Sequence, residues 1–361
     1  MTAFRIIDIE PQADGRWDAF VANHPDALVF HHSAWVAALE EAYGYRPRHL
    51  ACEVDGGELA GILPLVLKRG IITGRTLASL PHSPVAGPLV LGPTAAGSLV
   101  EGAIERMQVE RRAHLQLRTA GRELDGIAPE LAGRPGVLTY VVRLPDASED
   151  LRFGHSRNHG AIKRAVQKSA KAGVEVRPAE TSRDLAEWYG LYVDTTRAHG
   201  AVPHSRRFFD VIWELLEPHG FVELLLAERR DGGRTSLLAG SLFFRSGTRS
   251  VFFAFNGRRP DALSLRPNDA IHWCSIHDAW KRGVQEYDLG EAEGNPGLIG
   301  FKRKWGAEPR RLYRYYFPSP RDSALALQKS DSRLARAAEA TWRHLPTRAT
   351  ERLGDLLHRY L

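Results

Sequence analysis

The sequence predicts an α/β protein built from two related units, each with a mixed sheet flanked by helices. Its 361 residues exceed one ordinary core, and two domains of about 150 residues are the expected division. Helical and strand-like segments alternate along the chain. An Asp-Gly-Gly sequence lies between two strand-like segments in each half, at residues 55–57 and 231–233. Because such sequences favour hairpin turns, the recurrence indicates a similar hairpin in both units.

The composition is that of a water-soluble globular protein, with 43% hydrophobic and 25% charged residues. No apolar run reaches the roughly 18 to 20 residues that span a bilayer, and the N-terminus lacks the apolar core of a signal peptide. We therefore expect a cytoplasmic protein. The formal charge of +6 favours anionic partners such as tRNA, nucleotide sugars, CoA or an acidic membrane surface. A general abundance of Arg is the alternative explanation of this charge, and no DNA partner is expected.

Several common chemistries are excluded by what the sequence lacks. Cys52 and Cys274 are the only cysteines, so neither a disulfide scaffold nor a four-cysteine metal site forms within one chain. There is no HExxH motif, Cys-His cluster or carboxylate array, and we expect no metal. No Ser-His-Asp or Cys-His arrangement is visible either. Direct attack without a covalent enzyme intermediate is therefore the simpler expectation.

The first half is predicted from its periodicity and turn residues. Residues 4–9 read as a strand, and a helix capped by Ser33 follows. The next predicted elements are strands at 49–54 and 59–67, a Gly-Pro turn within 77–90, a helix at 99–112 and strands at 114–117 and 138–144. An acidic loop at 145–150 marks the expected boundary between the units.

The second half is read in the same way. A basic helix runs from about residue 160 to Gly173, because glycine ends helices readily. It is followed by a strand at 174–177, an aromatic helix containing Trp188, a helix at 207–216 and strands at 222–228, 237–244 and 250–256. A last strand is predicted at 310–317, and the tail reads as two helices separated by Pro346.

Residues 265–306 carry the strongest local pattern. A helix begins at Pro267 and ends at Gly283, with two cations in its last turn, where they suit the helix dipole. A strand at 284–289 leads into a predicted loop rich in Gly and Pro. The chain emerges at the cationic aromatic segment 301–306. A strand end, a flexible loop and such a segment are together expected to bind an anionic or acyl substrate.

This stretch resembles the Fem peptidoglycan aminoacyltransferases and their acetyltransferase-like relatives. The shared residues are P-N at the helix start, K-R-G at its end, Y-D-L-G at the strand end and G-L-x-x-F-K-x-x-W-G from Gly297 to Gly306. The aromatic helix, hairpin and Gly-Pro turn of the first half fit the same family. So does the basic segment with Arg157, Asn158 and Lys163. The W-x-x-L-P sequence from Trp342 resembles Fem-like proteins associated with exopolysaccharide and exosortase systems.

The resemblance implies tandem GNAT-type (Gcn5-related N-acyltransferase) domains. We expect a first domain at residues 1–145, a second at 146–320 that holds the active cleft, and a helical tail at 321–361; the last strand can return to the first domain. The long coiled-coil arm of staphylococcal Fem proteins has no counterpart within residues 178–300.

Acyl transfer to an amine needs a deprotonated nucleophile, an adjacent acyl donor and stabilisation of the developing oxyanion. By resemblance, Lys302 supplies positive charge to the acyl carbonyl or the tRNA terminus, and Phe301 and Trp305 shape the pocket. Asp288 accepts a proton from the acceptor amine or orients it; a strand-end contact is the alternative. Asn268 and His272 lie one helical turn apart and are expected at the cleft, although Asn268 is also a candidate helix cap.

Two basic groups are candidate phosphate ligands. Arg157, Asn158 and Lys163 fit phosphate or RNA contact, with a solvated helix face as the alternative. A second group lies in the stretch where ordinary acetyltransferases of this fold bind the CoA pyrophosphate. It comprises Arg258, Arg259 and Arg266. That stretch lacks a G-x-G turn, which favours the Fem-like group over CoA use.

The predicted function is amide formation on a cell-wall or envelope precursor, with aminoacyl-tRNA as co-substrate and no tightly bound cofactor. One alternative is an acyl-CoA-dependent N-acetyltransferase acting on an amino sugar or amine in exopolysaccharide biosynthesis. Another is a non-catalytic scaffold of an envelope assembly system. The Arg-rich tail also suggests peripheral contact with an anionic membrane.

Overall fold

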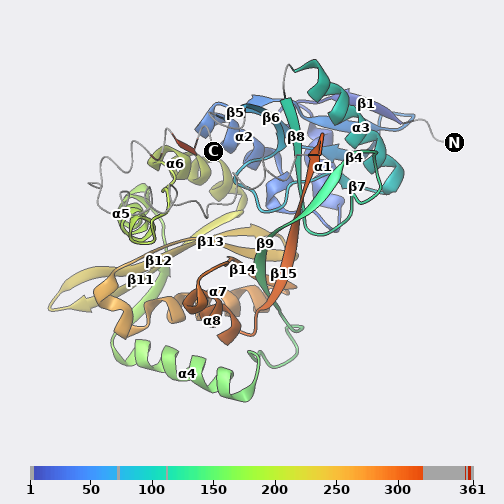
Figure 1. Ribbon diagram of the computed structural model, residues 1–361. Coiled ribbons are helices and arrows are strands. Elements are labelled where there is room, and N and C mark those ends of the chain that lie inside the picture. Colours follow the sequence, from blue (N-terminus) through green and yellow to red (C-terminus); the bar gives the residue numbers. More distant parts are fainter. Residues whose placement is uncertain (1–3, 71–73, 111–112, 320–353, 355–356, 359–361) are drawn as a thin grey trace. The chain divides into compact units, whose positions relative to one another are not determined.

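The computed structural model describes residues 4–70, 74–110, 113–319, 354 and 357–358 (Figure 1). Two compact units divide the chain at Val137 and Leu138, and the chain returns to the first unit at Arg311. Both units combine helices with sheets, so the predicted α/β class is confirmed. The predicted helical tail lies almost entirely outside the described residues. Among those residues, every helix is too short or too polar to cross a membrane.

The first unit contains two sheets. Its elements are β1 (Arg5–Asp8), α1 (Gly15–Asn23), η1 (Val29–His31), α2 (Ser33–Tyr43), β2 (Arg46–Pro47), β3 (Leu50–Glu53), β4 (Leu59–Leu63), β5 (Leu65–Gly70), β6 (Gly74–Ser79), β7 (Leu89–Val90), α3 (Pro93–Val109) and β8 (Ala113–Thr119). One sheet has the order β1-β3-β4-β7. The other has the order β2-β5-β6-β8, and residues 313–317 of β15 (Glu308–Phe317) pair with β8.

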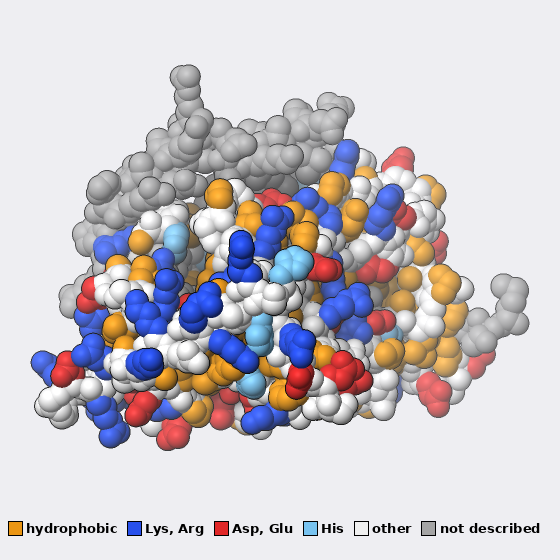
Figure 2. Space-filling model, turned by 90° about the horizontal axis from the view of Figure 1, so that it is seen from below, with side chains coloured by type: hydrophobic (Ala, Val, Ile, Leu, Met, Phe, Trp, Pro, Cys, Tyr) orange, Lys and Arg blue, Asp and Glu red, His pale blue; other side chains and the backbone are white. Residues whose placement is uncertain are grey.

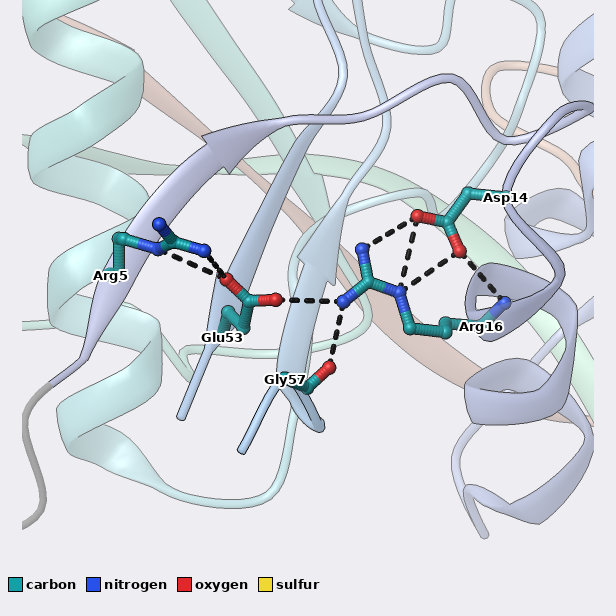
Figure 3. A network of polar contacts seen from close by, with 5 residues as sticks. All are labelled: Arg5, Asp14, Arg16, Glu53 and Gly57. Atoms are coloured by element: carbon teal, nitrogen blue, oxygen red, sulfur yellow. Dashed lines mark hydrogen bonds and ion pairs between the residues drawn. The ribbon is translucent and has the colours of Figure 1, made fainter. Parts of the chain in front are cut away.

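Glu53 ties three parts of the first unit together (Figure 3). Its carboxylate accepts hydrogen bonds from Arg5 of β1 and from Arg16 of α1, the latter at 2.7 Å. Arg16 also donates to the Gly57 carbonyl in the β3–β4 turn and to Asp14, the N-cap of α1. The two guanidinium groups hold the pKa of Glu53 below its ordinary value. The sequence analysis did not predict α1, which this network holds against the hairpin.

The second unit is built around a sheet of order β10-β11-β12-β13-β14-β9. Its elements are β9 (Ala132–Arg143), which enters from the first unit, α4 (Ser156–Lys171), β10 (Val174–Pro178), α5 (Ser182–Ala198), α6 (Arg206–Leu216), η2 (Glu217–His219), β11 (Val222–Asp231), β12 (Arg234–Ser246), β13 (Ser250–Arg258), η3 (Pro260–Leu265), α7 (Pro267–Lys281), β14 (Glu286–Glu291) and α8 (Pro296–Lys304). Neighbouring strands are antiparallel except β13 and β14, which are parallel.

Helices cover both faces of this sheet: α4, α7 and α8 on one, α5 and α6 on the other (Figure 1). The first face carries a continuous core that includes Ile271 of α7 and Trp305. On the second face, α5 approaches β13 so closely that a Cβ on Gly257 would lie 2.6 Å from the Tyr192 nitrogen. Only glycine fits at that position.

One expectation near the site is wrong: residues 296–300, predicted as part of a loop, begin the helix α8. Asn295 caps this helix, since its side chain accepts a hydrogen bond from the Leu298 N–H at 3.0 Å. Pro296 occupies the first turn, where its missing N–H is no loss. Two of the residues that suggested a loop, Pro296 and Gly297, therefore begin a helix.

The Glu53 network predicts pH-dependent stability of the first unit. A lowered carboxyl pKa stabilises the folded state above the ordinary pKa of Glu, and this contribution disappears as pH falls through the folded-state pKa. Glu53→Gln should therefore lower the melting temperature at pH 7. In acid, the melting temperatures of the variant and of the unchanged protein should converge. Melting curves from pH 7 to pH 3 test this; a constant difference across the range would contradict it.

Candidate functional site

The site begins where two parallel strands part. Pairing between β13 and β14 covers only Ser250–Phe252 with Glu286–Asp288, although β13 continues to Arg258. The turn of β14 occurs at Gly290, whose φ is +76°. A Cβ there would lie 2.9 Å from the Phe253 carbonyl oxygen. The sequence Y-D-L-G thus ends in a residue that must be glycine for both conformation and space.

A β-bulge accompanies this turn. Asp288 pairs with Val141, and Glu291 pairs with Thr139, so the interval from 288 to 291 on β14 opposes the shorter interval from 141 to 139 on β9. The extra residue re-aims the backbone. The carbonyl oxygens of Gly290 and Glu291, which are consecutive, therefore both accept hydrogen bonds from the Lys302 ammonium, each at 2.8 Å.

Lys302 lies on α8 with only 2% of its surface exposed. Burial lowers the pKa of its ammonium to about 8, while the negative charges of Asp288 and Glu291 act in the opposite direction. It is thus mainly protonated at neutral pH. The Tyr140 ring centre lies 5.8 Å from its Nζ. Of the three ammonium protons, two meet these carbonyls, and the third has no hydrogen-bond partner among the described residues.

Asp288 lies on β14, two residues before Gly290. One carboxylate oxygen, Oδ1, accepts hydrogen bonds from the Thr139 hydroxyl and from the Gly290 N–H, the latter at 2.8 Å. Burial raises the pKa of Asp288 to about 6, although both hydrogen bonds and the charge of Lys302 favour the ionised form. Gly290 therefore connects the two groups, donating to Asp288 through its N–H and accepting from Lys302 through its carbonyl.

The aromatic residues of the motif support Lys302 from the core. Trp305 is fully buried and packs edge-to-face on Phe153, with ring centres 5.1 Å apart. Phe301 lies 5.4 Å from the His272 ring. His272 is 1% exposed and contacts the Tyr287 hydroxyl at 3.1 Å. Burial and the charges of two lysines lower the pKa of His272 to about 3, so this imidazole is neutral and belongs to the core.

The start of α7 is occupied by the protein's own charges. Asp269, in the first turn, is 4% exposed and forms an ion pair with Lys304. Pro267 has no N–H to offer. The Asn268 side chain does not cap the helix, and its buried Oδ1 has no hydrogen-bond partner among the described residues.

The three predicted phosphate-binding arginines surround this helix start without converging there. Arg259 forms an ion pair with Asp261 at 2.5 Å, and Arg258 is half-buried at the end of β13. Arg266 is the exposed N-cap of α7, with a left-handed φ of 61°. A pyrophosphate needs free N–H groups and positive potential at such a helix end. Asp269 and Pro267 oppose both requirements, so these residues do not fit the CoA pyrophosphate.

The predicted ligands Arg157, Asn158 and Lys163 lie on α4, which packs against α7 and α8. Within the part of the chain that the structure describes, neither a hydrogen bond nor an ion pair joins them to Lys302 or Asp288. The helix has no acidic residue. A row formed by Arg157, Arg164, Lys168 and Lys171, spaced by seven, four and three residues, follows one helix face. We call these four residues the α4 stripe. Figure 2, seen from the side on which α4 lies, shows Lys and Arg side chains gathered on this face.

Sequence reasoning missed Thr139 and Tyr140. Both come from β9, far from the motif along the chain, and only the pairing of β9 with β14 brings them to the site. The Lys304–Asp269 pair was also missed. Its lysine lies within the F-K-x-x-W-G motif, but nothing in the sequence indicates its partner.

Comparisons with known proteins agree with this architecture. Residues 156–303 match a family described as acetyltransferase (GNAT) domain. No curated protein matches the sequence. Among solved structures, the chain is similar to FemX with a TM-score of 0.68 and 16% identity, covering 90% of this chain and 99% of that one.

Two further structures are similar at lower scores. The C-terminal domain (DUF2156) of a protein assigned as lysylphosphatidylglycerol synthetase, from Agrobacterium fabrum, has a TM-score of 0.56 and 15% identity, with 87% of this chain and 93% of that one covered. A tandem GNAT protein from the clavulanic acid biosynthesis pathway has a TM-score of 0.50 and 12% identity, with 88% and 99% covered. The predicted tandem GNAT fold is confirmed, and the family match of residues 156–303 supports the acyltransferase class.

The turn at Gly290 can be tested by stability. Gly290→Ala should lower the free energy of unfolding by about 2–4 kcal/mol, because a left-handed alanine costs about 1–2 kcal/mol and its Cβ also meets the Phe253 carbonyl. Gly283→Ala is the matched control, since Gly283 has a φ of +71° with nothing within 4 Å of a Cβ. Urea unfolding measures both; equal losses would contradict the close approach at Gly290.

Proposed function

We propose that this GNAT-fold acyltransferase transfers an aminoacyl group from aminoacyl-tRNA to an amine of a cell-wall or envelope precursor. The observation that carries the proposal is the pair of opposite charges at the point where β13 and β14 part. Lys302 is a buried cation held by two carbonyls, and Asp288 is a carboxylate with a pKa of about 6. Together they offer an oxyanion ligand and a base, which are the two groups that acyl transfer to an amine needs.

The proposed reaction is direct. The amine nitrogen attacks the ester carbonyl carbon of the aminoacyl-tRNA, while Lys302 donates its remaining hydrogen bond to the developing oxyanion. Asp288 accepts the proton that the amine loses. The ester C–O bond then breaks, an amide remains, and the ribose oxygen of the tRNA leaves with the proton that Asp288 had accepted. No covalent bond to the enzyme forms at any step.

Two features favour tRNA over CoA as the donor. The start of α7 carries Asp269, which opposes a pyrophosphate there. The α4 stripe spans about 21 Å at 1.5 Å per residue, a length that covers several phosphates of a nucleic-acid backbone. The solvated helix face is the competing explanation of this stripe. The chain shares its fold with FemX, and the Fem-like motifs of its sequence support aminoacyl transfer.

The nature of the acceptor rests on the Fem-like motifs and on the W-x-x-L-P sequence of the tail. We place the reaction in the cytoplasm, where charged tRNA is available, with peripheral contact to an anionic membrane as part of the proposal. The family description, acetyltransferase, favours one second candidate: N-acetylation of an amino sugar or amine from acyl-CoA in exopolysaccharide biosynthesis. The Lys302 ammonium binds both the Gly290 and the Glu291 carbonyl, which does not favour the alternative of a non-catalytic scaffold.

Donor binding separates the two candidates. Calorimetry with a mixture of charged tRNAs should show binding that weakens as salt rises, and acetyl-CoA should not bind. Neutralising Arg164 and Lys168 together should reduce the slope of log affinity against log salt by about 1.5 to 2. Arg229→Gln with Arg230→Gln, on the β11–β12 hairpin, is the matched control of equal charge change. Binding of acetyl-CoA alone would overturn the tRNA proposal.

Lys302→Met should reduce kcat about 100- to 1000-fold, the usual loss when one oxyanion ligand is removed. The measurement is transfer of a labelled aminoacyl group from tRNA to a peptidoglycan precursor that carries a free amine. Because the change also leaves two carbonyls without their partner, melting curves must accompany it. Lys281→Met, at the exposed last turn of α7, controls for loss of a lysine. Full activity of a folded Lys302→Met protein would exclude the proposed role.

The pKa values predict a bell-shaped dependence of kcat on pH. The rate should rise as Asp288 loses its proton near pH 6 and fall as Lys302 loses its proton near pH 8. Asp288→Asn should abolish the acidic limb and lower the maximum about 100-fold or more. Lys302→Arg should remove the basic limb, because a guanidinium stays protonated. An acidic limb that persists in Asp288→Asn would assign that limb to another group.

A further inference from the structure

Thr139 lies at the centre of β9 with 1% of its surface exposed. It pairs with Glu291, immediately after the bulge of β14. Its hydroxyl donates to Asp288 Oδ1 across 149 positions of sequence. A buried hydroxyl needs such a partner, whereas a valine of the same shape would fill this site without one. The hydroxyl therefore has a specific use at this position.

That use follows from the second donor to the same oxygen. Asp288 Oδ1 receives the Gly290 N–H at 2.8 Å as well as the Thr139 hydroxyl. Two donors on one oxygen fix the plane of the carboxylate. Among the described residues, Oδ2 accepts no hydrogen bond. The carboxylate is thus anchored by one oxygen, and the other remains available to a substrate proton.

The same anchor reaches Lys302. The bond from the Gly290 N–H to Asp288 closes a short turn of the kind that Asp side chains form with the backbone two residues later. This turn fixes the Leu289–Gly290 peptide, which directly precedes the two peptides whose Gly290 and Glu291 carbonyls bind the ammonium. A displaced Asp288 would release the Gly290 N–H and change the direction of both carbonyls.

We infer that Thr139 is a positioning residue of the site: its hydroxyl fixes the Asp288 carboxylate, and through the β14 bulge it aligns the two carbonyls that hold Lys302. It touches neither donor nor acceptor. Its importance for catalysis rests on the proposed function, but its effect on Asp288 does not.

The test is a titration of Asp288 that requires no substrate. Carbon-13 NMR of carboxyl-labelled aspartate follows each side chain, and the Asp288→Asn spectrum identifies the Asp288 signal. Thr139→Val removes a donor that favours the ionised carboxylate, so the Asp288 midpoint should rise by about one pH unit, a tenfold gain in proton affinity. Thr139→Ser keeps the hydroxyl and should titrate as the unchanged protein does.

The control is Val142→Thr, the reverse substitution on the other face of β9, where Val142 pairs with Tyr287. It should lower stability without moving the Asp288 midpoint. Thr139→Val with an unmoved midpoint would overturn the inference, as would an equal shift in Val142→Thr. If the Thr139→Val midpoint shifts but no aminoacyl transfer is found in any variant, the proposed function fails and the positioning role stands. In an active enzyme, Thr139→Val should lower kcat about tenfold with little change in KM.

Discussion

The site depends on one left-handed residue. Gly290 turns β14 away from β13. Its backbone N–H donates to Asp288, and its carbonyl accepts from Lys302. The parallel strands separate there because the turn interrupts their pairing after Asp288. Without the bulge, consecutive carbonyls would point to opposite sides of the strand and could not share one ammonium. The conformation of a single glycine thus determines where the strands part, where Lys302 is held and how Asp288 is oriented.

Burying these charges sets their chemistry. An ammonium taken out of water favours its neutral form, and a carboxylate does the same, so their pKa values approach each other from opposite sides. The values of about 8 and about 6 leave both groups charged only in a narrow interval around neutrality. Carbonyl dipoles compensate the cation, and two hydrogen-bond donors compensate the anion. Each group is therefore ionised at neutral pH yet close to its titration point, as proton-transfer catalysis requires.

The fold could be largely predicted from local patterns, because helices and hairpins carry their signals within a few residues. The basic helix before Gly173, the Asp-Gly-Gly hairpin of β11 and β12 and the helix starting at Pro267 are found where the sequence places them. Lys302 and Asp288 could be named because each lies in a short motif, and in the structure both bind backbone groups of Gly290. Residues 296–304 were misread since Pro and Gly mark helix starts as well as loops. Thr139 could not be found, because its role arises only from the register of β9 with β14.

The pair of Asp269 and Lys304 has a consequence for how this fold diversifies. It occupies the helix start at which ordinary acetyltransferases of this fold are expected to bind the CoA pyrophosphate, and it involves neither the bulge nor the Lys302 ammonium. In the proposed function, the choice of donor therefore depends on the start of α7, whereas acyl transfer depends on the bulge of β14 and on α8. Substitutions at the α7 start would then alter donor choice while Lys302 keeps its two carbonyl partners.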